Sequence, residues 1–77
     1  LMIEHSFEYS IGVDLGGTNL KFVAAKHSGE ELARAHDTTN DDGNAADSWR
    51  QKISSQIQHW TKEFGAPQSV GLSAPGL

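Results

Sequence analysis

The sequence predicts an α/β fold with a mixed sheet, in which three strands are followed by a helix and a fourth strand. Apolar residues alternate with small or polar residues from Tyr9 to Leu15, and this period of two is typical of a strand. Apolar residues recur every three or four positions from Ala46 to Phe64, which indicates an amphipathic helix. A helix between strands forms a crossover, so we expect the last strand to lie beside the first and parallel to it.

Residues 9–38 are predicted to form a three-stranded meander after a leader of residues 1–8. On the face opposite its apolar residues, the first strand carries small or polar residues, and glycines are among them. Because glycine contributes no packing, we expect another group to approach the backbone at Gly12 and Gly16. The residues after the glycine pair are again apolar, which indicates a second strand rather than the start of a helix. A Ser-Gly turn then leads to a weaker third strand over 31–38.

The helix is predicted over residues 44–64, where Asn44 would cap the first turn and Asp47 would complement the exposed amides. Gly65 would end the helix, because glycine tolerates the left-handed conformation of a C-terminal cap. Residues 69–77 are predicted to form a short strand and a Pro-Gly turn. One helix covers one face of a sheet only, so we interpret the chain as the incomplete N-terminal part of a domain. The apolar stripe of the helix comprises Ala46, Trp49, Ile53, Ile57, Trp60 and Phe64.

The composition excludes several kinds of site. The 77 residues include no cysteine, which excludes disulfides, thiolate nucleophiles and thiolate-rich zinc sites. The formal net charge is -4, no basic stripe is present for a nucleic-acid backbone, and no apolar run could span a bilayer. We therefore expect a cytoplasmic protein that binds neither nucleic acid nor membrane. The histidines share no metal-ligand spacing, and we expect each to be a surface or half-buried imidazole rather than a ligand: His5, His27, His36 and His59.

A candidate phosphate loop follows the first strand. Gly16 and Gly17 would let backbone amides converge on an anion, and Thr18 would add a hydroxyl donor. Asp14, at the end of the strand, would supply a hard oxygen ligand to a magnesium ion bound to the phosphates. Lys21 would add positive charge, although strand alternation alone leaves its direction open.

Two other phosphate motifs are excluded by the same residues. The dinucleotide fingerprint needs glycines that open a helix, whereas here Asp14 occupies the second glycine position and a strand follows. The P-loop signature Gly-x-x-x-x-Gly-Lys-Ser/Thr is absent. The predicted hairpin therefore distinguishes this loop from both motifs.

Two segments carry a resemblance to a known family. The segment Ile11 to Lys21 resembles the first phosphate motif of the actin, hexokinase and heat-shock chaperone superfamily. Its Asp-x-Gly-Gly-Thr form with Lys21 is most similar to the ROK family (repressors, open reading frames, kinases), which includes bacterial glucokinases. The segment Val70 to Gly76 is similar to the Gly-x-x-x-Pro-Gly strand and turn that borders the sugar cleft in that family. The resemblance covers only the N-terminal part of a ROK protein.

The resemblance implies a ribonuclease-H-like sheet in an ATP-dependent kinase of a hexose or N-acetylhexosamine, with ATP and Mg2+ as cofactors. Asp14 would serve the metal, and the sugar cleft would involve Ser73, Ala74, Pro75 and Gly76. The catalytic aspartate, the adenosine-binding segment and the family's zinc cluster would lie beyond Leu77. The full-length protein is expected to be a homo-oligomer, and the 77 residues alone are expected to be inactive. The nucleotide would be bound by Asp14, Gly16, Gly17, Thr18, Asn19 and Lys21.

Two alternatives remain from the sequence. A sugar-responsive transcription regulator of the same family would normally carry a DNA-binding module before the first strand, and only eight residues precede Tyr9. A chaperone or cytoskeletal ATPase of the superfamily is the second alternative. Chaperones tend towards Gly-Thr-Thr where this chain has Gly-Gly-Thr, which favours the kinase.

Overall fold

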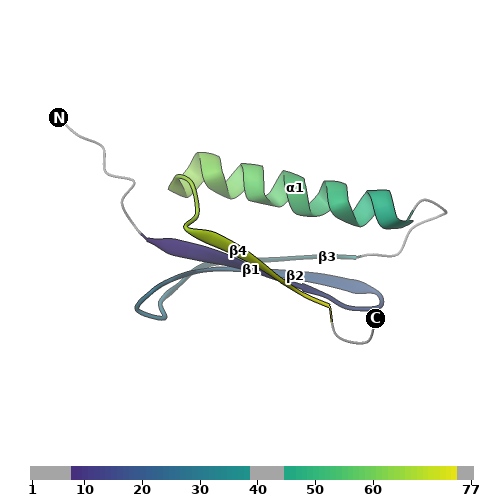
Figure 1. The fold of residues 1–77 in the computed structure, drawn as a ribbon, viewed down its shortest axis with the longest axis horizontal. Helices are drawn as coiled ribbons and strands as arrows, with labels where there is room; N and C mark the ends of the chain where they lie inside the picture. Colours follow the sequence, from purple (N-terminus) through teal and green to yellow (C-terminus); the bar gives the residue numbers. More distant parts are fainter. Residues whose placement is uncertain (1–7, 39–44, 75–77) are drawn as a thin grey trace.

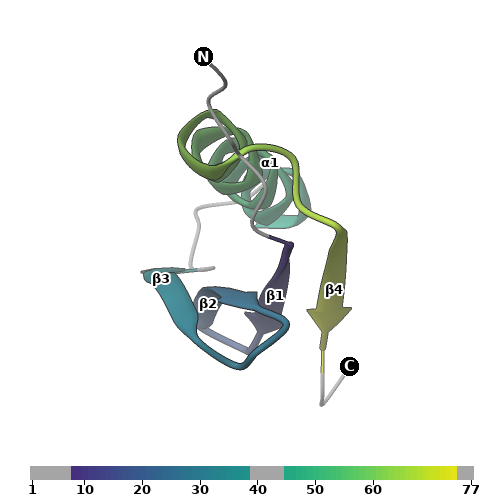
Figure 2. The same ribbon diagram turned by 90° about the vertical axis from the view of Figure 1, so that its left-hand side faces the viewer.

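The computed structural model describes residues 8–38 and 45–74. These residues form a four-stranded sheet with a single helix packed on one face (Figures 1 and 2). The strand order is β3-β2-β1-β4, with antiparallel pairs along the meander and a parallel pair between β1 and β4. The predicted mixed sheet and order of elements are therefore confirmed. The elements are β1 (Tyr9–Leu15), β2 (Asn19–Lys26), β3 (Glu31–Thr38), α1 (Ala45–Phe64) and β4 (Ser69–Ser73).

Two predicted features lie outside the described residues. The expected cap at Asn44 belongs to the segment 39–44, and the expected Pro-Gly turn belongs to residues 75–77. The other end of the helix is described, and it ends as predicted. Gly65 has a φ of 92°, a left-handed conformation that stops the helix without steric cost because glycine has no Cβ.

The core lies between the sheet and α1. Alternation along β1 and β2 directs every second side chain toward the helix, and Trp60 of α1 closes the core with 3% exposure. The Trp60 ring meets Phe22 edge to face, with centroids 6.4 Å apart. The rest of the predicted helical stripe that the structure describes packs around this core while partly buried. The buried set is Tyr9, Ile11, Val13, Leu15, Leu20, Phe22, Ala24 and Trp60.

Tyr9 connects the start of β1 to the end of α1. Its side chain is fully buried, and its Oη donates a hydrogen bond of 2.6 Å to the carbonyl of Gly65. Its ring packs edge to face on Phe64, with centroids 5.7 Å apart. Its own carbonyl accepts a hydrogen bond of 2.8 Å from the amide of Gln68. One residue thus fixes both the exit of the helix and the return of the chain toward β4.

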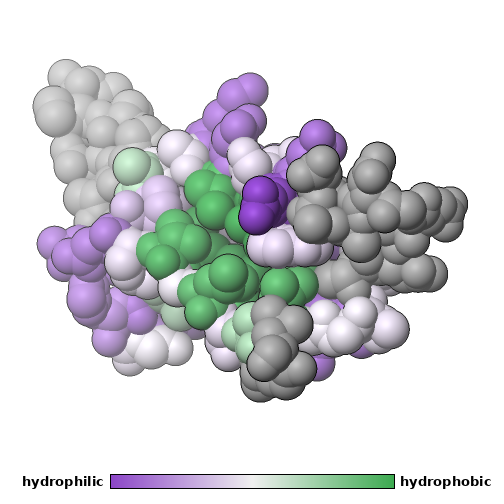
Figure 3. Space-filling model, turned by 45° about the vertical axis from the view of Figure 1, so that its right-hand side comes forward, coloured by the Kyte–Doolittle hydropathy of each residue, from purple (hydrophilic) through white to green (hydrophobic). Residues whose placement is uncertain are grey.

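The sheet is less covered at β4 than at its centre. Val70 and Leu72 point to the same side as the buried residues of β1, yet they are 44% and 54% exposed. Leu72 borders a shallow groove with Trp49, Ile53 and Ile57 of α1. Figure 3 shows hydrophobic side chains gathered on the surface of the molecule. Within the described residues, β4 is also hydrogen-bonded on one side only, to β1.

Replacement of Tyr9 by phenylalanine tests the connection that Tyr9 makes between the start of β1 and the end of α1. Burial raises the pKa of Tyr9 above its ordinary value of 10.0, because the folded state disfavours the phenolate. The stabilisation by the neutral Tyr9 side chain should therefore be fully present below pH 10. It should be lost as the pH rises further, since the Tyr9 hydroxyl ionises at a lower pH in the unfolded chain than in the folded protein. Tyr9→Phe should lower the free energy of unfolding by about 1 kcal/mol near neutral pH.

Urea unfolding at neutral pH measures the effect of the mutation, and unfolding above pH 10 measures the effect of Tyr9 ionisation. Lysines also titrate above pH 10, and Tyr9→Phe shows how much of the alkaline loss they cause. The wild type should lose more stability than Tyr9→Phe over the alkaline range. The chain contains one tyrosine, so phenolate absorption reports this residue alone. Equal alkaline losses in the two proteins would contradict the role assigned to the hydroxyl.

Candidate functional site

The candidate site lies where the first hairpin turns. Because β4 is parallel to β1, its C-terminal end reaches the same end of the sheet as the β1–β2 loop (Figure 1). The register places Asp14 beside Lys21 on β2 and beside Ser73 on β4. Three predicted site residues from three strands therefore share one row across the sheet.

This row lies on the sheet face opposite α1, which we call the open face. Asp14 and Lys21 alternate with the buried residues of their strands, and both are exposed. The structure thus resolves the direction of Lys21 that the sequence left open. His36 continues the row on β3, where it pairs with Lys21. The row therefore runs Ser73, Asp14, Lys21 and His36.

The carboxylate of Asp14 forms no ion pair with Lys21, although the two residues are paired in register. Among the described residues, no three acidic, histidine or cysteine side chains gather as a metal site. Magnesium does not require such a cage, because it commonly takes one or two carboxylates and completes its shell with phosphate oxygens and water. The donor set at Asp14 fits that mode of binding.

The loop itself differs in one respect from the expected arrangement. The amide of Gly16 donates a hydrogen bond of 2.8 Å to the carbonyl of Asn19. Moreover, Gly29 and Gly65 are the described glycines with positive φ, so Gly16 and Gly17 do not form a nest through left-handed glycine. The tight turn therefore already uses the N–H group of Gly16, and the expected convergence of the glycine amides on an anion stays a prediction.

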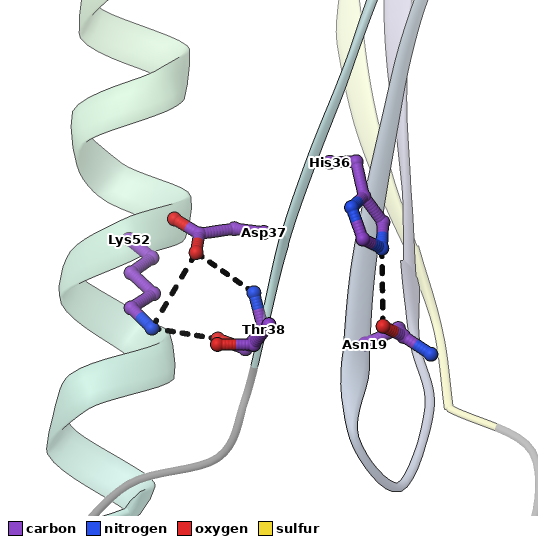
Figure 4. A network of polar contacts seen from close by, with 5 residues as sticks. All are labelled: Asn19, His36, Asp37, Thr38 and Lys52. Carbon is purple, nitrogen blue, oxygen red and sulfur yellow. Dashed lines mark hydrogen bonds and ion pairs between the residues drawn. The ribbon is translucent and has the colours of Figure 1, made fainter.

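The side chains that follow the glycines form a connected chain of hydrogen bonds. Asn19 Nδ2 donates to Thr18 Oγ1 at 3.3 Å. On the other side of the same amide, Asn19 Oδ1 lies 3.0 Å from His36 Nε2 (Figure 4). Thr18 at the tip of the loop is thus linked through Asn19 to β3.

A shallow groove of about 540 Å³ extends from Asp14 along the open face. Its floor contains the paired glycines Gly12 and Gly71. A Cβ atom added at either glycine would meet nothing within 4 Å. The group that we expected to approach Gly12 is therefore not supplied by the described residues, and the backbone there stays accessible from outside.

The predicted sugar-cleft residues are only partly described. Ser73 is exposed at the end of β4 and lines the groove. Ala74 is partly buried and packs against the core. Pro75 and Gly76 lie outside the described residues.

Sequence reasoning missed His36, which we expected to be an ordinary surface or half-buried histidine. It is exposed, but its Nε2 contacts Oδ1 of Asn19, the first residue of β2, which lies 17 positions away in the sequence. From the sequence, His36 could have been found only by its position opposite Lys21 in the predicted antiparallel pair of strands. That position depends on the register of β2 and β3.

Comparisons with known proteins identify the fold. No protein-family model matches the chain, and no curated protein matches it. Among solved structures, the chain is similar to the crystal structure of an Aquifex aeolicus member of the Ppx/GppA protein family, with a TM-score of 0.67 and 12% sequence identity. The match covers 88% of this chain and 26% of the other.

This likeness supports the predicted fold class. The four-stranded mixed sheet with one helix corresponds to a fragment of the ribonuclease-H-like fold found in actin-like ATPases. The chain spans about a quarter of the length of the structure that it matches, 26%. Over 8–38 and 45–74, no helix is long and apolar enough to cross a membrane.

Proposed function

We propose that this chain forms the phosphate-binding part of an ATP-dependent sugar kinase, with a hexose or N-acetylhexosamine as the acceptor. The observation that carries the proposal is the exposed carboxylate of Asp14 next to the tight turn that presents Thr18, at the end of a central strand. The actin-like ATPase fold supports nucleotide binding in general. The choice of a sugar as acceptor, and of the ROK family, rests on the resemblance of two sequence segments.

Each residue of the site has a chemical role in this proposal. Asp14 would hold a magnesium ion or its water shell, and the ion would neutralise charge on the phosphates. The hydroxyl of Thr18 would donate a hydrogen bond to a phosphate oxygen. Lys21, on the same face as Asp14, would attract the anionic nucleotide at a distance. Ser73 would line the adjoining side on which the acceptor binds.

Another ATPase of the same superfamily is the second candidate. Its phosphate loop would have the same architecture, and the likeness to a Ppx/GppA protein supports it as well as it supports a kinase. A sugar-responsive regulator would share the sugar cleft. A kinase would transfer the phosphate of ATP to a sugar, whereas another ATPase would transfer it to water. An assay must therefore separate phosphate transfer to sugar from hydrolysis.

Replacement of Gly17 by alanine tests whether a phosphate approaches the loop backbone. The added methyl group would meet nothing within 4 Å and would need no positive φ. The free energy of unfolding should therefore stay equal or rise by about 0.5 kcal/mol, because alanine restricts the unfolded chain. Binding of Mg-ATP should weaken roughly 5- to 100-fold if the methyl group occupies the space that the phosphate needs.

Calorimetric titration with Mg-ATP and urea unfolding measure these two quantities. Gly29→Ala provides the comparison, because its φ of 97° makes alanine unfavourable in the turn between β2 and β3. This variant should lose stability and keep its affinity in conditions where it is folded. Undiminished Mg-ATP binding by Gly17→Ala would argue against a phosphate at the loop.

Replacement of Asp14 by asparagine tests the magnesium role. With Mg2+ present, ATP affinity should fall about tenfold or more, since a contact to a charged group is lost. With Mg2+ removed by a chelator, the same variant should bind ATP as well as or better than wild type, because a carboxylate no longer repels the phosphates. Glu63→Gln removes an exposed carboxylate from the far end of α1 and should change neither affinity. A magnesium-independent loss in Asp14→Asn would contradict the assignment.

Turnover assays test the kinase itself. A longer protein that contains this chain should transfer phosphate from ATP to at least one hexose or N-acetylhexosamine in a coupled assay. The 77-residue chain alone should give no turnover, because none of its residues matches the expected catalytic base. Hydrolysis of ATP without transfer to any sugar would favour the second candidate. Turnover by residues 1–77 would show that the chain is not a partial domain.

A further inference from the structure

We propose that His36 is a positioning residue for the candidate phosphate loop. Through Asn19 it would direct the hydroxyl hydrogen of Thr18 outward, where that hydrogen can meet a phosphate oxygen. The inference rests on the proposed phosphate-binding function of the loop. It adds a residue from a different strand, outside both segments that resemble known motifs.

The direction of the hydrogen bonds follows from the chemistry of the groups. With the Asn19 amide oriented as in the structure, Oδ1 can only accept, so the matching tautomer of His36 carries its proton on Nε2, at 3.0 Å, and donates it. Asn19 Nδ2 can only donate, so Thr18 Oγ1, at 3.3 Å, must accept. The hydroxyl hydrogen of Thr18 cannot point at Asn19 in this arrangement, and it is directed elsewhere.

The alternative orientation of the Asn19 amide would have the opposite effect. A half-turn of the amide would bring Nδ2 to His36 and Oδ1 to Thr18. Oδ1 would then accept the hydroxyl hydrogen of Thr18, and that hydrogen would no longer be available to a ligand. This state fits only the His36 tautomer that lacks a proton on Nε2, so a His36 that carries a proton on Nε2 disfavours it, because two donors would then face each other. A proton on Nε2 of His36 is therefore the feature by which His36 would hold the Asn19 amide in the orientation that lets Thr18 donate outward.

The end of β3, which carries His36, is held by contacts to α1 on the opposite face of the strand. Lys52 of α1 donates a hydrogen bond of 2.6 Å to the carbonyl of Thr38, and its Nζ lies 3.7 Å from Asp37 Oδ1. The amide of Thr38 donates to Asp37 Oδ1 at 2.7 Å. Figure 4 shows these contacts on the helix side of β3 and the His36–Asn19 contact on the other. The end of β3 is thus anchored to α1, and His36 transmits that anchoring to the loop.

A double-mutant cycle with Mg-ATP as the probe tests the proposal. The variants, made in a longer protein that contains this chain, are His36→Ala, Thr18→Val and the combination of both. Valine keeps the shape of threonine and removes the hydroxyl group. If His36 acts through that hydroxyl, His36→Ala should weaken Mg-ATP binding about 3- to 10-fold in the wild-type background. In the Thr18→Val background its effect should be less than about 2-fold.

Two further variants separate this role from a general structural one. His36→Gln keeps a side-chain nitrogen that can donate to Asn19 Oδ1, so its Mg-ATP affinity should lie within about 2-fold of wild type. His59→Ala removes an exposed histidine of α1 that lies beside Glu63, and it should have no effect. An equal loss on His36→Ala in both Thr18 backgrounds, or no recovery in His36→Gln, would overturn the proposal.

A measurement without ligand distinguishes a failure of this inference from a failure of the proposed function. In wild type, imidazole nitrogen shifts in an NMR spectrum should show His36 protonated at Nε2, and His36→Ala should shift the side-chain amide signals of Asn19. If a longer protein that contains this chain binds no Mg-ATP, the proposed function is wrong, and these spectra still decide the hydrogen-bond relay. A proton on Nδ1 alone, or unmoved Asn19 signals, would overturn the relay.

Discussion

The buried hydroxyl of Tyr9 and the backbone around it set the geometry on which the candidate site depends. Its bond to the carbonyl of Gly65 fixes where α1 ends, and the bond from Gln68 to its carbonyl fixes where the chain rejoins the sheet. From that point β4 runs parallel to β1 in a single register, which ends with Ser73 beside Asp14. The residues at the far end of the sheet therefore owe their alignment to contacts at its near end.

Much of the fold was predictable because its patterns are local. The alternation of apolar and polar residues in β1 and the apolar stripe of α1 predict which side chains face the core. Gly65 predicts where the helix ends. The site was less predictable. The turn pairs Leu15 with Leu20, which fixes the face of Lys21, and no residue pattern alone specifies that register. The same limit concealed His36, since its contact with Asn19 requires the pairing of β2 with β3. The inward amide of Gly16 depends on backbone angles that glycine leaves open.

The comparison and the residues inform different levels of the proposal. A similarity at 12% identity describes a common arrangement of strands and helix, and such an arrangement supports many chemistries. The phosphate proposal depends instead on Asp14, Gly17 and Thr18 at the hairpin tip. The sugar proposal depends on the β4 segment, of which the structure describes Ser73 and Ala74. The proposal of nucleotide binding therefore rests on these residues, and the proposed identity of the acceptor rests on sequence resemblance.

The exposed outer strand has a consequence for the chain in solution. β4 has the sequence Ser-Val-Gly-Leu-Ser, without a charge or a proline, and these are the features by which natural edge strands usually resist pairing with other chains. Its outward N–H and C=O groups lie next to Val70 and Leu72, which are exposed apolar side chains. Such an edge can template the addition of a further strand. Within the part of the chain that the structure describes, the same strand that aligns Ser73 with Asp14 thus leaves an open edge at which a further strand can pair.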